Sequence, residues 1–174
     1  MPASRHAAAR TAAVALAALA LTAFAAVVVT ACARGRTGGI PEGGLELVVS
    51  VQSDGRRLLA VPASAGDRLE FEWIHSVEHF PWFETFDIEA DGALILRETR
   101  IGGFGAGVPY ERGTSAGVED GFVVYRGIDE TYPAYRWINS TTATAAISLN
   151  GKVVARGSDF PHHEALELRA IPRR

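Results

Sequence analysis

Hydrophobic and polar residues alternate in short runs along most of the chain after residue 44, a period typical of half-buried β-strands. Turn signals separate the runs, among them Asp91-Gly92 and Asn150-Gly151, which favour tight hairpins. No stretch of this region has a convincing helical period with capping residues. The predicted strands are Leu45–Val51, Arg57–Val61, Asp67–Val77, Phe83–Glu89, Ala93–Thr99, Phe122–Tyr125, Ala134–Ile138, Ala143–Leu149, Val153–Arg156 and Leu166–Ile171. The pattern predicts an all-β fold, an antiparallel β-sandwich or barrel-like domain of about nine strands.

The segment 71–86 is the richest in aromatic, histidine and carboxylate residues, and it predicts a hairpin that turns around residues 78–81. A register that pairs residue 73 with residue 86 places every partner on one mostly apolar face. In that register His75 lies opposite Glu84. An imidazole held by a carboxylate is either a structural pair within the core or a general base or metal ligand with its supporting group. The sequence leaves both interpretations open.

Four side chains of this hairpin have the donor types that zinc prefers: His75, Glu78, His79 and Glu84. Along an extended strand His75 and His79 would be about 13 Å apart, which is too far to share one metal ion. Only a turn directly after His75 could bring the two rings together. A metal site is therefore a hypothesis that the spacing neither requires nor excludes.

A glycine-rich stretch without strand signals runs from Ile101 to Gly121. Within it, Gly105, Gly107 and Pro109 belong to the run Phe-Gly-Ala-Gly-Val-Pro. Closely spaced glycines allow backbone N–H groups to converge on an anion or a carboxylate. The alternative is a tightly folded loop that covers one end of the β domain.

The N-terminus has the features of an export signal. Basic residues at positions 5 and 10 precede an uncharged apolar run from Thr11 to Ala33. The run ends in Val-Thr-Ala-Cys32, which resembles the bacterial lipobox, and Cys32 is the single cysteine of the chain. This predicts a signal peptide over 1–31, a lipidated Cys32 followed by a flexible tether over 32–44, and a β domain over 45–174. A retained anchor helix is the alternative, since the run is long enough to span a bilayer. Either reading places the β domain outside the cytoplasmic membrane and anchors it there.

Charge narrows the classes of partner. The whole chain has a formal net charge of −3, and loss of the two arginines in the signal segment makes it −5. An acidic domain is not typical of proteins that bind nucleic acid or anionic membrane surfaces. With one cysteine no internal disulfide can form, so stability must come from the core.

An ordered set of motifs resembles the DUF1850 family. The motifs are His75-Ser-Val-Glu78, Pro81, Glu84-Thr-Phe86, Leu94 to Thr99 and Gly103 to Pro109, and the resemblance extends over residues 45–171. The family has no established function or catalytic residues. Its members are small exported or membrane-tethered proteins, often encoded beside TRAP transporter permeases that use TAXI-type solute-binding proteins. The resemblance implies such a permease or solute-binding protein as a partner. It marks His75, Glu78, Glu84, Gly105, Gly107 and Pro109 as candidate binding residues.

Two functional hypotheses follow. The first is a non-enzymatic accessory or binding module without a cofactor, anchored outside the cytoplasmic membrane and associated with a TRAP-type transporter. The second is a metal-dependent or general-base hydrolase with its site at the His75/Glu84 end of the hairpin.

Overall fold

The computed structural model describes residues 44–105, 107–109 and 111–173. Residue contacts divide the chain into residues 1–39 and residues 40–174, and the described residues all belong to the second unit. The predicted signal peptide, Cys32 and nearly all of the tether lie outside the described residues. Within the described part of the chain, no helix has the length and apolar character needed to cross a membrane.

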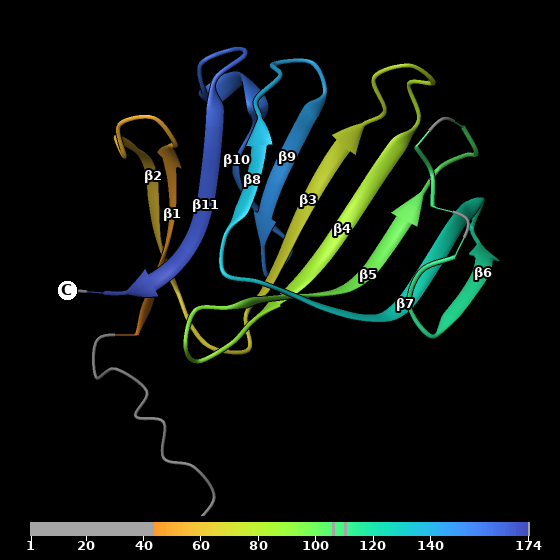
Figure 1. The fold of residues 1–174 in the computed structure, drawn as a ribbon, viewed down its shortest axis with the longest axis horizontal. Coiled ribbons are helices and arrows are strands. Elements are labelled where there is room, and N and C mark those ends of the chain that lie inside the picture. Colours follow the sequence, from red (N-terminus) through yellow and green to blue (C-terminus); the bar gives the residue numbers. More distant parts are fainter. Residues whose placement is uncertain (1–43, 106, 110, 174) are drawn as a thin grey trace, which may run out of the picture. The chain divides into compact units, whose positions relative to one another are not determined.

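In the described part of the chain, eleven strands form two antiparallel sheets (Figure 1), which confirms the predicted all-β sandwich. One sheet has four strands in the order β2-β1-β11-β8, and the other has seven in the order β10-β9-β3-β4-β5-β7-β6. The elements are β1 Leu45–Val51, β2 Arg57–Ala63, β3 Arg68–Ile74, β4 Pro81–Ile88, β5 Leu94–Ile101, β6 Ser115–Glu119, β7 Phe122–Tyr132, β8 Tyr135–Ile138, β9 Thr144–Leu149, β10 Lys152–Ala155, the 3-10 turn η1 Gly157–Asp159, and β11 Ala165–Pro172.

The main core lies between the two sheets. Alternate residues of β1 and β11, such as Leu47, Val49 and Leu168, are fully buried against Phe71 of β3 and Phe86 of β4. These are the apolar positions of the period-two pattern, so the alternation read from the sequence identifies the faces that meet. A smaller apolar cluster is centred on Ile101, Val123 and Tyr125, toward the β6 edge of the seven-stranded sheet.

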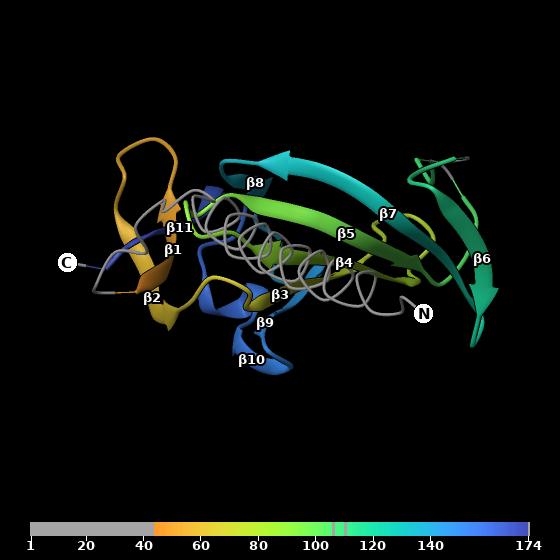
Figure 2. The ribbon, with the colours of Figure 1, turned by 90° about the horizontal axis from the view of Figure 1, so that it is seen from below.

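Strand β7 connects the two layers. It pairs with β5 and β6 in the seven-stranded sheet, and the chain then continues directly into β8 of the four-stranded sheet (Figure 2). The sequence predicted only the first four residues of β7 as a strand. Strand β6 was not predicted at all, because it lies in the glycine-rich stretch and all five of its residues are exposed.

The predicted hairpin forms, but its predicted register is wrong by four residues. Phe71 lies opposite Glu84, Trp73 opposite Trp82 and Ile74 opposite Pro81. Strand β3 ends at Ile74, so His75 lies in the turn and is not opposite Glu84. An even-numbered slip keeps every side chain on the same face, which is why alternation alone could not fix the register. Pro81 does not break the strand: it is the first residue of β4, a position that tolerates proline.

Candidate functional site

Backbone and side-chain hydrogen bonds of His75 close the turn between β3 and β4. The backbone N–H of His79 donates to the carbonyl of His75 at 2.9 Å, and the N–H of His75 donates to the carbonyl of Phe80 at 2.9 Å. The His75 ring contributes as well, because its Nδ1 accepts from the N–H of Glu78 at 3.1 Å. An accepting Nδ1 means that a neutral ring carries its proton on Nε2. The sequence predicted the turn and its residues, but it assigned His75 to the strand.

The glycine-rich loop packs directly on this turn. Gly102 donates its N–H to the carbonyl of Pro81 at 2.8 Å. A Cβ on Gly103 would lie 2.7 Å from Cδ1 of Phe80, and a Cβ on Gly105 would lie 2.7 Å from Cγ of Glu78. The close atom at Gly103 belongs to an aromatic ring, so glycine is favoured there, whereas at Gly105 it belongs to the flexible side chain of Glu78, which would have to shift. We call residues 75–81 and 102–105 together the tip.

Two large hydrophobic side chains are exposed on the tip. Val77 is 66% exposed and Phe104 is 74% exposed. Each is next in sequence to a residue of the contact between Glu78 and Gly105, so the two lie on loops that touch. Figure 1 shows the two loops beside each other at the upper right of the sandwich. Exposed apolar side chains on two neighbouring loops are typical of contact surfaces.

Sequence reasoning placed His75 and Glu84 together, and the structure separates them. The His75 ring stacks on Phe80, with ring centroids 4.8 Å apart, and lies parallel to the ring of Trp82 at 6.4 Å. Glu84 lies on β4, where its carboxylate binds other partners. Among the described residues no group of three His, Cys, Asp or Glu side chains is arranged to hold a metal ion. The hydrolase hypothesis depended on a His75/Glu84 pair that does not form.

Glu84 belongs to a polar cluster on the inner face of the seven-stranded sheet. Its side chain is 12% exposed, and its Oε2 accepts a short hydrogen bond from the hydroxyl of Tyr135 on β8. Its Oε1 lies 3.7 Å from Nη1 of Arg112, in the loop that follows the tip. Arg112 also donates to Glu130 through Nη2 at 2.8 Å, and the hydroxyl of Tyr132 donates to the same Glu130 oxygen at 2.6 Å. The cluster joins β4, β7, β8 and the loop, so it holds the loop against the sandwich.

Ionisation in this cluster is tuned by burial and charge. Burial, followed by the hydrogen bond to Glu130, raises the pKa of Tyr132 to about 12. Burial and the neighbouring charge of Glu84 raise the pKa of Tyr135 far above its ordinary value. Hydrogen bonds from Arg112 and then Tyr132 lower the pKa of Glu130. At neutral pH both phenols are therefore protonated donors and Glu130 is a carboxylate, which is the state in which the cluster is fully hydrogen-bonded.

The other two predicted loop residues lie past the tip. Gly107 has a positive φ of 85° and open space around a Cβ position. The carbonyl of Pro109 accepts a hydrogen bond of 2.7 Å from the hydroxyl of Tyr125 on β7. Val108 packs on the small cluster of Ile101, Val123 and Tyr125, and its N–H donates back to Gly105 at 3.2 Å. In this part of the loop the observed contacts are those of a cover over the sheet, the second of the two interpretations given to the sequence.

Several residues of the site were not marked by the sequence: Glu130, Tyr132 and Tyr135 of the polar cluster, and Phe104 and Val77 as the exposed side chains. One signal was available. Glu84 was predicted on a mostly apolar face, and a carboxylate in that position needs a cation or a donor. The sequence supplied His75 as the nearest partner, whereas the true partners come from 28 and 51 residues further along the chain.

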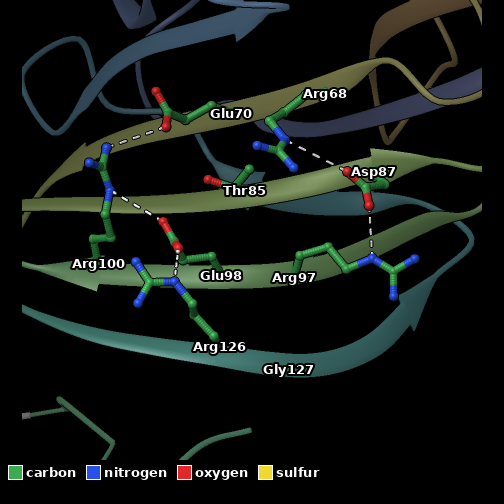
Figure 3. Close-up of a pocket in the computed structure, with 9 residues that line it drawn as sticks. All are labelled: Arg68, Glu70, Thr85, Asp87, Arg97, Glu98, Arg100, Arg126 and Gly127. Atoms are coloured by element: carbon green, nitrogen blue, oxygen red, sulfur yellow. Dashed lines mark hydrogen bonds and ion pairs between the residues drawn. The ribbon is translucent and has the colours of Figure 1, made fainter. Parts of the chain in front are cut away.

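The outer face of the seven-stranded sheet is charged and shallowly hollowed (Figure 3). The hollow has a volume of about 590 Å³ and is lined by Arg68, Glu70, Thr85, Asp87, Arg97, Glu98, Arg100, Arg126 and Gly127. Arginines and carboxylates alternate across neighbouring strands, for example Arg97 with Asp87 at 2.9 Å and Arg126 with Glu98 at 2.7 Å. Arg100 also lies over the ring of Phe83 at 4.6 Å. This surface is a lattice of ion pairs in which each arginine already has a carboxylate.

The fold and site define a two-sheet antiparallel β domain with a composite loop tip at one end. The chain belongs to the DUF1850 family: the model of that family, described as a domain of unknown function, matches residues 69–155. The matched range runs from the second residue of β3 to the last residue of β10, so it includes the tip and the polar cluster. No curated protein and no solved structure matches the chain.

Proposed function

We propose that this protein is a non-enzymatic binding module, anchored outside the cytoplasmic membrane by lipid on Cys32, that docks through its tip on a component of a TRAP-type solute transporter. The observation that carries the proposal is the tip itself. Three glycines of one loop, Gly102, Gly103 and Gly105, lie so close to the turn of another that an added Cβ would come within 3 Å of its atoms. Val77 and Phe104 on these two loops are exposed to solvent.

The construction of the tip favours binding of a protein. The two loops approach each other closely at glycines of the second loop. Further along that loop, Arg112 forms ion pairs with Glu84 and Glu130, which hold the loop to the sheet. A surface held in one conformation loses little entropy when a partner binds. Exposed valine and phenylalanine gain most from being covered by a partner, at roughly 25 cal/mol for each Å² of apolar surface removed from water.

The position of Gly44, the first described residue, supports the same use. Gly44, where the described chain begins, lies beside Ala63 at the end of β2 and accepts a hydrogen bond from the N–H of Arg173 at 3.0 Å. Strand β3 starts five residues after Ala63 and runs away from this end for seven residues, or about 23 Å, before it reaches the tip. Gly44 and the tip therefore lie at opposite ends of the β3 strand direction, which supports a use of the tip in binding a protein partner.

The proposed class of partner comes from the family resemblance. The predicted export signal and the lipobox-like sequence at Cys32 are consistent with such a partner, because both predict a domain outside the cytoplasmic membrane. The acidic charge of the exported chain fits a protein partner better than an anionic lipid surface. The two partners to be distinguished are the membrane-embedded permease and the TAXI-type solute-binding protein.

The experiment is co-purification of the full chain from detergent extracts of cells that also express a tagged permease or a tagged solute-binding protein. We expect the wild-type chain to co-purify with one of them. The amount of the double variant Val77→Ser/Phe104→Ser that co-purifies should be at least tenfold lower. Ile138→Ser is the matched control, because Ile138 is 63% exposed on β8 of the other sheet. Failure of the wild-type chain to co-purify with either, or equal recovery of the double variant, would contradict the proposal.

A further inference from the structure

The two sheets have four edge strands, and three of them carry features that prevent pairing with another strand. Strand β10 has only four residues, begins with Lys152 and contains a register shift. Strand β2 contains Arg57 and Pro62 and also has a shifted register. Strand β8 has only four residues and includes Arg136. Short length, charge, proline and bulges are the usual ways in which natural sheets block their edges.

Strand β6 is the fourth edge, and it has fewer of these features: it is one residue longer than β8 and β10, and its one charged residue is Glu119. It pairs with β7 along all five residues without a register shift, and its sequence Ser-Ala-Gly-Val-Glu contains no lysine, arginine or proline. All five residues are exposed, and Figures 1 and 2 both show β6 at the outer limit of the sheet. Among the described residues no backbone hydrogen bond joins another segment to its outer edge. An open, regular edge of this kind is a template for a further strand.

The two sides of β6 differ in chemistry. Ala116 and Val118 lie opposite Tyr125 and Val123, so they extend the apolar side of the sheet, and Val118 is 71% exposed. Ser115, Gly117 and Glu119 point to the charged side, where Glu119 pairs with Arg126. A partner strand must therefore be apolar on one face and free of opposing acids on the other.

We propose that β6 pairs antiparallel with the β6 of a second copy of this chain, about a two-fold axis at Gly117. The two seven-stranded sheets then join into one continuous sheet. This inference rests on the edge strand alone and does not depend on the function proposed for the tip.

The strand is self-complementary in this register. Val118 faces the partner subunit's Ala116 on the apolar side, so a side chain that is exposed in the single chain is covered. Glu119 faces the partner subunit's Ser115, and the two Glu119 carboxylates are four residues apart along the strands, about 13 Å. Gly117 faces the partner subunit's Gly117, where no side chains meet. Directly opposed pairs are the strongest determinants of strand pairing, and here none of them is repulsive.

The axis residue provides a sharp test, because a side chain fits at Gly117 in the single chain. Its φ is not in the positive region, and a Cβ would have nothing within 4 Å. Gly117→Glu or Gly117→Lys should therefore fold as wild type does. In the dimer, however, each variant would place two like charges directly opposite each other, about 5 Å apart at Cβ. A mixture of the two variants would place a carboxylate opposite an ammonium group.

The measurement is the mass of the full chain in detergent, by light scattering corrected for bound detergent, across a range of protein concentrations. We expect wild type to approach twice the mass of one chain, each Gly117 variant to remain at the single-chain mass, and the equimolar mixture to recover the doubled mass. Ile138→Glu is the control, because it adds an acid to the exposed edge strand β8 and should leave the wild-type mass unchanged. Melting temperatures of all variants check that they are folded.

Three outcomes would overturn the proposal. The first is a wild-type chain that stays at single-chain mass at every concentration, which would leave the edge to a strand from another protein. The second is a Gly117→Glu variant that dimerises as wild type does. The third is a mixture of the two charged variants that remains monomeric, since the two axis positions would then not face each other.

Discussion

The two faces of the seven-stranded sheet both carry acid–arginine pairs, and they differ in what surrounds them. On the inner face Glu84 is 12% exposed and Arg112 is 19% exposed, and the carboxylate also accepts from the hydroxyl of the half-buried Tyr135. On the outer face Glu98 is 25% exposed and Arg126 is 46% exposed, within a lattice of similar pairs. The outer pair has the better distance, 2.7 Å against 3.7 Å.

Judged by distance alone, the outer pair would contribute more to the stability of the fold. The surroundings of the two pairs reverse this order. Exposed ion pairs contribute about 0–1 kcal/mol, because water and salt screen them and ordering long side chains costs entropy. A buried charge that loses its partner has no water to replace it, so removing one member is far more costly. The comparison teaches that few ion pairs in the right place matter more to this fold than many on its surface.

The largest effect should come from Glu84→Ala. Removing the carboxylate leaves the hydroxyl of Tyr135 without its acceptor and removes one of two acids from Arg112. We expect a loss of about 3 kcal/mol in the free energy of unfolding, measured by denaturant titration. Glu98→Ala on the outer face is the matched control and should cost no more than about 1 kcal/mol. Equal losses in the two variants would refute the difference between the faces.

A second substitution tests whether close packing at the tip contributes to stability, in addition to the ion pair between Glu84 and Arg112. Gly103→Ala would place a Cβ 2.7 Å from the Phe80 ring, and we expect a cost of about 1–3 kcal/mol because a packed ring must move. Gly117→Ala is the matched control, since open space surrounds its Cβ position, and it should be neutral or slightly stabilising. Denaturant titration of both variants measures the difference. If Gly103→Ala were as stable as Gly117→Ala, the loop would not be rigidly seated on the turn.

How much of this arrangement the sequence predicts depends on the range of the interactions. Period-two alternation predicted the sandwich and most strands, because burial of one strand face is a local pattern. The same alternation could not choose between registers that differ by an even number, so it placed Glu84 opposite His75 when Phe71 is there. The partners of Glu84 could not be found, since Tyr135 is 51 residues away and Arg112 lies in a loop without periodicity. Strand β6 was missed because it is exposed on both sides and carries no alternation.

The free energy of unfolding should fall at alkaline pH, because two tyrosines on the inner face have raised pKa values. The pKa of Tyr132 is raised from 10.0 to about 12 and that of Tyr135 is raised further, so the folded state keeps protons that the unfolded state loses near pH 10. Stability therefore falls as the pH rises from about 10 toward 12. Tyr132→Phe should weaken this dependence, measured as denaturant midpoints at several pH values. An unchanged pH dependence in Tyr132→Phe would show that the phenol does not lose its proton preferentially on unfolding.

The smallest expected effect is a difference in how salt changes the stability losses of Glu98→Ala on the outer face and Glu84→Ala on the inner face. At about 1 M ionic strength the Debye length is about 3 Å, so exposed charges hardly interact. The stability difference between wild type and Glu98→Ala should then shrink to nearly nothing, because Glu98 and Arg126 are accessible to ions. The difference between wild type and Glu84→Ala should persist, because its main cause is the lost acceptor of the half-buried Tyr135 hydroxyl rather than a screened attraction. Denaturant titrations of the three proteins at low and high sodium chloride measure both differences. A Glu84→Ala loss that disappeared with salt would mean that the inner pair is as solvated as the outer one, and the loop would have to be held by its packing on the tip alone.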